Sequence, residues 1–213
     1  MFQNSLFEKH KALEDVQQRL IQLQHENLNL LTGGDSYCIV YPSLQKKGDI
    51  YSMSFVMVNY GNFPLKDVEI RVTDLRYKRK LQKRFAEDFK DGKKNFDDFD
   101  EKIISPDFVF KIPFLPQSII KENGYESSVA ETVEYPRSRV HDELIFNIFI
   151  RIPNGNYTQQ TIIRDVTGTR FFWVKAVRIL PNSKDYKFER IDPMFLKEDE
   201  AAIDWDSILG QEE

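Results

Sequence analysis

The sequence has very little cysteine, no long apolar run and only a small net charge. Its single cysteine, Cys38, excludes a framework of internal disulfides and favours a reducing compartment, so we expect a cytoplasmic protein. No apolar run approaches the roughly 18 residues of a membrane-spanning helix, and the N-terminus lacks the apolar core of a signal peptide, so membrane association would have to go through a partner. With a net charge of −4, the chain as a whole is not expected to attract polyanions.

Histidine is also scarce, with three residues, and common catalytic motifs are missing. There is no His-Glu-x-x-His, no Cys-x-x-Cys and no Gly-x-Ser-x-Gly motif. We interpret His10 and His25 as solvated helix residues. His141 belongs to a polar loop, where a weak cation site with the two following acids is the alternative. Cys38 has no positioned base and is interpreted as a small buried hydrophobe.

One acidic segment, DGKKNFDDFDE, could be compared with calcium-binding loops because its aspartates lie close together. Lys93 stands at the third position and no glycine at the sixth, so the segment fails the EF-hand pattern. An irregular Ca²⁺ site remains the alternative to a solvated loop. We therefore expect no catalytic residue, no metal ion and no cofactor, and we class the chain as a non-enzyme.

What the sequence does contain is a long helical pattern at its N-terminus. Residues 5–31 lack proline and glycine, and Ser5 with Glu8 forms a capping box that predicts the helix start. Three heptads follow, with these residues at positions a and d: Leu6, Leu13, Val16, Leu20, Leu23, Asn27 and Leu30. This seam predicts self-association into a homo-oligomer, and Asn27 at position a favours a parallel, in-register arrangement.

Further apolar residues widen the helix face beyond a two-stranded seam. Phe7, Ile21 and Leu28 fall at position b and Leu31 at position e, while no pair of g and e residues forms an ion pair. The wide face is compatible with more than two strands. Two alternatives stay open, namely packing of the helix against its own domain and pairing with a helix of another protein.

The helix pattern ends at a glycine pair in NLLTGGDSYCIVY (Asn29–Tyr41). Gly33 and Gly34 follow the last periodic residue, where glycine in the left-handed conformation closes helices. A phosphate-binding loop needs the opposite order, in which a strand precedes the glycines and a helix follows them. We therefore interpret residues 32–36 as a joint between the helix of residues 1–31 and a domain over residues 37–192.

Residues 37–192 contain short apolar runs separated by turn residues. With 17 Phe and 9 Tyr, the composition favours a core of aromatic and β-branched strands. Because most runs have no helix between them, we predict an antiparallel β-sandwich. The predicted strands are Tyr37–Tyr41, Tyr51–Tyr60, Val68–Asp74, Ile104–Lys111, Ser128–Tyr135, Glu143–Ile152, Thr158–Val166, Phe171–Leu180 and Tyr186–Ile191.

A short amphipathic helix is predicted between two of these strands, because Tyr77, Leu81, Phe85 and Phe89 recur every four residues. Its polar positions hold the strongest basic cluster of the chain, which consists of Arg76, Lys78, Arg79, Lys80, Lys83 and Arg84. This cluster makes a nucleic-acid or anionic-surface binding module the alternative function. Acids follow directly, so a solvated or acid-paired face, including pairing with the acidic C-terminal tail, is the competing interpretation.

The tail, residues 193–213, is acidic and contains Trp205, Ile208 and Leu209 as apolar anchors. Such a pattern is typical of a docking peptide for a basic groove. The alternative is a terminal element tucked on its own domain, with Asp192 and Pro193 as N-cap and first residue of a helix.

Two stretches carry a resemblance to known proteins. FVMVNYGNFPLKDVEIRVTD (Phe55–Asp74) resembles the paired strands of immunoglobulin-like and fibronectin-type-III-like domains. NYTQQTIIRDVTGTRFFWVKAVRIL (Asn156–Leu180) is similar to the closing hairpin of uncharacterised bacterial proteins. In those proteins a coiled coil, usually behind membrane helices, precedes a β-sandwich through a joint like Thr32–Ser36. No membrane helix stands before Ser5 in this sequence, so we expect that the chain either departs from that pattern or lacks the anchor here. The resemblance implies an immunoglobulin-like sandwich and no catalytic residues.

Together these patterns predict a non-enzymatic, oligomeric binding or assembly protein. The N-terminal helix would associate with copies of itself, and each sandwich would bind another protein or macromolecule. Weak contacts of single sandwiches would become firm through avidity.

Overall fold

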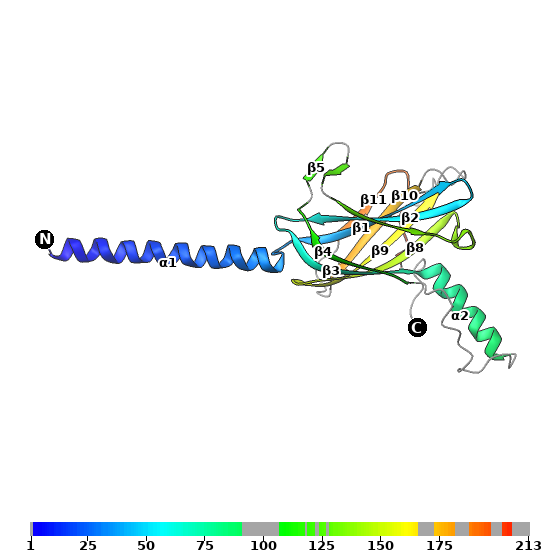
Figure 1. Ribbon diagram of the computed structural model, residues 1–213, viewed down its shortest axis with the longest axis horizontal. Helices are drawn as coiled ribbons and strands as arrows, with labels where there is room; N and C mark the ends of the chain where they lie inside the picture. Colours follow the sequence, from blue (N-terminus) through cyan, green and yellow to red (C-terminus); the bar gives the residue numbers. More distant parts are fainter. Residues whose placement is uncertain are drawn as a thin grey trace.

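The computed structural model describes residues 2–90, 107–117, 119–121, 124–126, 128–165, 173–181, 188–196 and 202–205. Its first element is α1 (Phe2–Thr32), a straight helix that projects from one end of a β-rich body (Figure 1). The predicted long helix is confirmed. The predicted start is wrong, because the helix begins at Phe2 and Ser5 lies inside it.

The body consists mainly of two antiparallel sheets, which confirms the predicted β-rich fold. The smaller sheet has the order β1-β2-β7, with β1 (Tyr37–Lys47), β2 (Ile50–Tyr60) and β7 (Val129–Glu134). The larger sheet has the order β11-β10-β9-β8-β3-β4. Its strands are β3 (Leu65–Asp74), β4 (Asp107–Leu115), β8 (Glu143–Ile152), β9 (Gly155–Asp165), β10 (Trp173–Pro181) and β11 (Phe188–Ile191).

Three smaller elements complete the described part of the chain. A two-stranded hairpin is formed by β5 (Ile119–Lys121) and β6 (Gly124–Glu126), and Arg137–Arg139 forms a single 3₁₀ turn. The predicted amphipathic helix is α2 (Leu75–Lys90), which follows β3 directly and leaves the body at the end opposite to α1 (Figure 1).

The main core lies between the two sheets. On β2, alternate residues from Tyr51 to Met57 are buried, and on β8 alternate residues from Leu144 to Ile152 are buried. Phe55 of β2 lies at the centre, with its ring centroid 5.3 Å from that of Phe110 and 6.0 Å from that of Phe146. This two-residue periodicity is what a sheet with one buried face requires.

A second, smaller core lies on the outer face of the larger sheet. Ile145 of β8 and Ile162 of β9 point outward there, and Phe195 and Trp205 of the C-terminal segment cover them. Phe195 and Trp205 are therefore part of the folded body.

The edge of the smaller sheet at β1 is closed by side chains from the opposite sheet. The backbone N–H of Cys38 donates to the Tyr157 hydroxyl, which donates to the Cys38 carbonyl at 2.5 Å. The Val40 N–H donates to Gln159 Oε1 at 2.9 Å, and Gln159 Nε2 donates to the Val40 carbonyl at 2.5 Å. Pro42 lies further along the same strand, and proline is tolerated in edge strands. Strand β1 runs on to Lys47, beyond the predicted end at Tyr41, because residues 42–47 pair with Ile50–Phe55 of β2.

Other strand boundaries differ from the predicted ones by a few residues. Strand β4 covers Asp107–Leu115 where Ile104–Lys111 was predicted, and β9 starts at Gly155 instead of Thr158. Residues 104–106, 166, 171–172 and 186–187 of the predicted strands lie outside the described residues.

Candidate assembly helix and the two ends of the sandwich

The helix α1 exposes its apolar residues to solvent. The seam residues Leu13, Val16, Leu20, Leu23 and Leu30 have exposed fractions between 46% and 61%, and Asn27 is exposed as well. The side chain of Leu6 lies outside the described set. Packing of the helix along its own domain is therefore wrong as an interpretation.

The described side chains that widen the apolar face are exposed to a similar degree, and that of Phe7 lies outside the described set. Ile21, Leu28 and Leu31 have exposed fractions between 55% and 64%. Large apolar side chains gathered on one surface of a soluble protein mark a site of interaction. The exposed set on α1 spans about five helical turns between Leu13 and Leu31, at 3.6 residues per turn.

The joint predicted from the glycine pair is present where α1 ends. Gly33 has a φ of +87° and Gly34 a φ of +53°, the left-handed region that closes helices. The Gly33 N–H donates to the Asn29 carbonyl at 2.8 Å, and the Thr32 hydroxyl donates to the Leu28 carbonyl at 2.9 Å. The joint thus supplies hydrogen-bond donors to two carbonyls near the end of α1.

The joint is also packed tightly against the sandwich. A Cβ atom on Gly33 would lie 2.6 Å from Leu65 Cδ2, and one on Gly34 would lie 2.5 Å from Phe63 Cδ2. The side-chain nitrogen Nδ2 of Asn154, in the turn between β8 and β9, donates to the carbonyls of Gly34 at 2.7 Å and Ser36 at 2.9 Å. Hence α1 is held in one direction relative to the sheets.

The opposite end of the sandwich holds the first turn of α2. Asp74 is almost fully buried, and its Oδ1 accepts the Tyr77 N–H at 3.0 Å, which is the N-cap bond of a helix. Its Oδ2 accepts the Tyr135 hydroxyl at 2.5 Å. The guanidinium of Arg139 lies 3.6 Å from the centroid of the Tyr77 ring, close enough for a cation–π contact.

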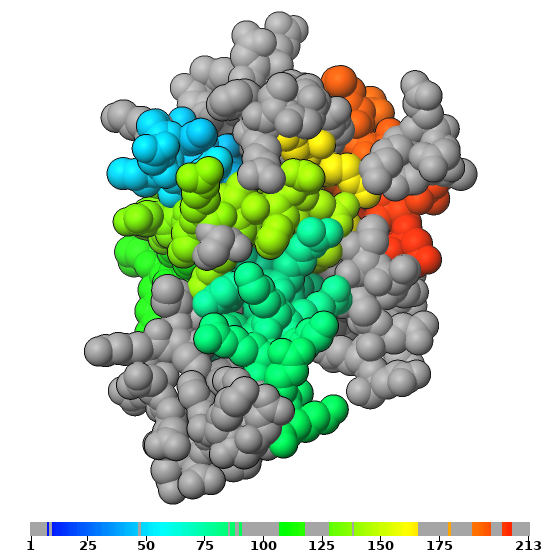
Figure 2. Space-filling model, turned by 90° about the vertical axis from the view of Figure 1, so that its right-hand side faces the viewer, coloured from blue at the N-terminus to red at the C-terminus, as the bar shows by residue number. Residues whose placement is uncertain are grey.

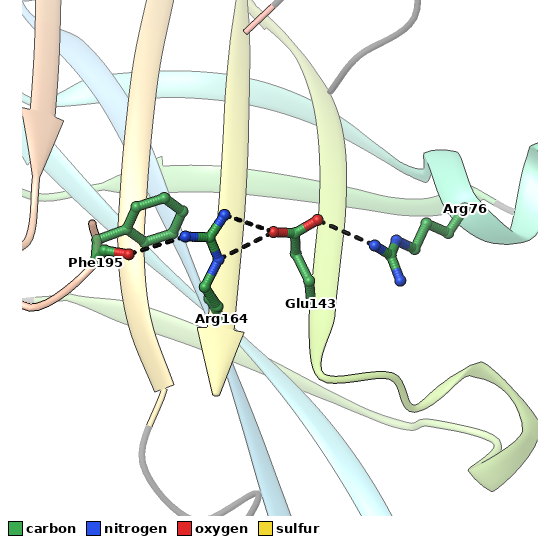
Figure 3. Close-up of polar contacts among 4 residues, drawn as sticks. All are labelled: Arg76, Glu143, Arg164 and Phe195. Carbon is green, nitrogen blue, oxygen red and sulfur yellow. Dashed lines mark hydrogen bonds and ion pairs between the residues drawn. The ribbon is translucent and has the colours of Figure 1, made fainter. Parts of the chain in front are cut away.

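A row of charged side chains adds a second anchor on the outer face of the larger sheet (Figure 3). Arg76 Nη2 lies 3.0 Å from Glu143 Oε1, and Arg164 Nη2 lies 2.9 Å from Glu143 Oε2. Arg164 Nη1 also donates to the Phe195 carbonyl at 3.0 Å. Glu143 thereby connects α2, β8 and β9, and Arg164 connects them to the C-terminal segment.

The predicted basic cluster is divided by these contacts. Arg76 is bound to Glu143, and Lys78 is half-buried. The other four members are exposed on α2, namely Arg79, Lys80, Lys83 and Arg84.

The predicted docking role of Trp205 is wrong for the described structure. Trp205 is only 5% exposed, and its indole N–H donates to Glu189 Oε1 at 2.6 Å. Asp192 begins a turn rather than a helix, since its carbonyl accepts the Phe195 N–H at 2.8 Å. Ile208 and Leu209 lie outside the described residues.

The titratable groups with clearly shifted pKa values belong to the fold. Burial raises the pKa of the Cys38 thiol to about 12. Burial also raises the pKa of Tyr157, and burial together with the charge of Asp74 raises that of Tyr135. A thiol that holds its proton so tightly is a poor nucleophile, so Cys38 acts as a core residue.

Among the described residues, no group of three or more His, Cys, Asp or Glu side chains is placed to hold a metal ion. Neither described helix is long and apolar enough to cross a membrane.

Sequence reasoning missed Asp74, Glu143 and Asn154. Asp74 stands directly before the periodic residues of α2, which is an N-cap signal that the sequence offered. Glu143 and Asn154 had no such local signal, because their partners are distant in the sequence.

Comparison with known proteins gives no match among family models, curated proteins or solved structures.

Proposed function

We propose that this chain is a non-enzymatic assembly protein, in which α1 pairs with copies of itself and holds several β-sandwiches side by side. The exposed apolar face of α1 carries the proposal. Burying one leucine, valine or isoleucine side chain contributes roughly 1.5–3 kcal/mol. A helix that leaves eight such residues in water, from Leu13 to Leu31, gains strongly from a partner.

A second copy of the same helix is the partner that the heptad pattern fits best. Residues at positions a and d of identical parallel helices meet one another, so the apolar seam is complementary to itself. Asn27 would face Asn27 of the second copy, where the two amides bond each other and fix the register. The additional apolar residues Ile21, Leu28 and Leu31 favour a bundle of three or more helices.

The joint gives such an assembly a defined shape. Because Gly33, Gly34 and Asn154 tie α1 to the sheets, parallel helices would hold their sandwiches at one end in a fixed orientation. Sandwiches clustered in this way bind a repeated or extended partner with avidity. We further propose that the sandwich is immunoglobulin-like, on the resemblance of Phe55–Asp74, and that the protein acts in the cytoplasm.

The test is the solution mass of the full chain, measured by light scattering over a range of concentrations. The double variant Leu20→Glu, Leu23→Glu places charges in the seam. The control Gln18→Glu, His25→Glu adds glutamates at position f, on the opposite side of the helix.

We expect the wild type and the control to have a multiple of the 25.2 kDa chain mass, and the seam variant to have the mass of one chain. All three keep a folded sandwich, because the substituted residues are exposed. A wild type that stays monomeric at about 100 μM, or a control that dissociates with the seam variant, overturns the proposal.

A further inference from the structure

The helix α2 carries a second exposed surface, at the end of the sandwich opposite to α1 (Figure 1). Arg79, Lys80, Lys83 and Lys90 recur at spacings of three, four and seven residues, so they lie on one face of the helix, and Arg84 lies beside them. All five side chains are exposed. We call these five residues the α2 basic face.

This face is presented by a firmly anchored element. The first turn of α2 is held by the Asp74 cap, by the Arg76–Glu143 ion pair and by the stacking of Arg139 on Tyr77. In Figure 2, which looks directly at this end of the molecule, α2 lies at the centre in blue-green, beside the yellow-green strand β8. Its charges are therefore displayed at a fixed place and not on a loose tail.

We propose that the α2 basic face binds the phosphate backbone of double-stranded nucleic acid without sequence preference. Among the described α2 side chains on this face, Glu87 is the one acid beside Lys80, Lys83, Arg84 and Lys90, so the face has an excess of positive charge even without Arg79. Arginine and lysine are the residues that contact phosphates in such complexes. With side chains, an α-helix is about 10–12 Å wide, which matches the roughly 12 Å width of the major groove.

A nucleic acid fits this face better than a lipid surface. Membrane-binding helices place large apolar residues next to their basic ones and insert them between the lipids. Among the α2 side chains that the structure describes, the large apolar ones, Leu75, Tyr77 and Leu81, are half-buried, and the remaining exposed positions near the basic face hold Gln82 and Ala86. The side chains of Phe85 and Phe89 lie outside the described set. The contacts are then purely electrostatic, and the affinity of one chain is low and depends steeply on salt.

The test is binding of a labelled 20-base-pair duplex to the full chain, followed by fluorescence anisotropy between about 50 and 200 mM salt. The variant Lys80→Gln, Lys83→Gln, Arg84→Gln removes three charges of the α2 basic face. The control Lys66→Gln, Lys111→Gln, Arg151→Gln removes three charges from β3, β4 and β8. Vesicles with anionic lipid headgroups are measured in parallel.

For the wild type we expect log K to fall against log[salt] with a slope of about −3 to −4, as roughly four phosphate contacts require. The α2 variant loses at least about ten-fold in affinity and most of the slope, while the control binds like the wild type. No duplex binding at 50 mM salt, an equal loss in the control, or tighter binding to the vesicles than to the duplex overturns the inference. The outcome does not depend on self-association of α1, because a seam variant that is monomeric still carries the face.

Discussion

Single residues at the joint decide whether α1 and the sandwich form one rigid unit. Gly34 has a positive φ and lies against the Phe63 ring, and its carbonyl is bonded by Asn154. An alanine there meets two separate penalties, the strain of the left-handed conformation and the contact with Phe63.

Gly34→Ala should therefore destabilise the fold more than Gly48→Ala. Gly48 has a similar φ of +63°, but a Cβ atom there would have nothing within 4 Å. Gly48→Ala should lower the free energy of unfolding by about 1–2 kcal/mol, the usual penalty of the left-handed region. Gly34→Ala should lower it by a further 1–3 kcal/mol or so, because the Phe63 ring has to shift. Urea unfolding of both variants measures the difference, and equal losses would show that the joint is loosely packed.

Among the helices and strands, α2 depends most on one side chain. Asp74 provides both the N-cap of α2 and the acceptor for the Tyr135 hydroxyl. Loss of an N-cap lowers stability by about 0.5–2 kcal/mol, and a buried hydroxyl left without its partner lowers it by about 1–3 kcal/mol.

Asp74→Ala should combine both losses, whereas Tyr135→Phe should remove only the bond to the hydroxyl. We expect Asp74→Ala to lower the free energy of unfolding by about 2–4 kcal/mol and to speed hydrogen exchange in the first turn of α2. Tyr135→Phe should leave that exchange unchanged. If hydrogen exchange in the first turn of α2 is equally fast in both variants, the Asp74 cap does not hold that helix.

The same elements show which parts of the fold can be predicted from sequence. The helix α1, its end at the glycine pair and the helix α2 follow from patterns within a few residues, such as heptads, Gly33 and the four-residue spacing from Tyr77. The bonds from Tyr157 and Gln159 to β1 join residues 119 positions apart. They depend on which strands face each other, so no local pattern indicates them.

The candidate sites also include parts that the sequence shows and parts that depend on distant contacts. The α2 basic face and the seam of α1 are visible as periodic sequence patterns. Arg76 looks like another member of the cluster, and only the placement of β8 shows that it is bound to Glu143, which is 67 positions away. Trp205 looks like a docking anchor for the same reason, because its partners Ile145 and Ile162 lie on distant strands.

For the molecule as a whole, the two helices place two kinds of surface at opposite ends of one sandwich. The end at α1 exposes apolar side chains, and the end at α2 exposes basic ones, and the two helices leave the sandwich at opposite ends (Figure 1). Self-association through α1 would bring several α2 basic faces into one particle, and their weak contacts would then add up.

The stability of the whole sandwich should fall at alkaline pH. Cys38, Tyr135 and Tyr157 keep their protons in the folded chain well above the ordinary values, which are 9.0 for the thiol and 10.0 for the phenols. In the unfolded chain these groups lose their protons at their ordinary pKa values. The contribution of these three protonated groups to the free energy of unfolding is therefore fully present below about pH 9. It is lost progressively as the pH rises toward the raised pKa values of the folded state.

Cys38 titrates first, so its effect can be isolated between pH 9 and pH 10. In that interval the free energy of unfolding of the wild type should fall by about 1 kcal/mol more than that of Cys38→Ala, the linkage expected of one group whose folded pKa lies near 12. Cys38→Ala should lose only the smaller contribution of the two tyrosines, whose ordinary pKa is 10.0 and which contribute more above pH 10. Urea unfolding at pH 8, 9, 10 and 10.5 measures these slopes. A wild type as insensitive as Cys38→Ala would mean that water reaches the thiol, and that β1 does not close the edge of the sandwich as its bonds to Tyr157 and Gln159 require.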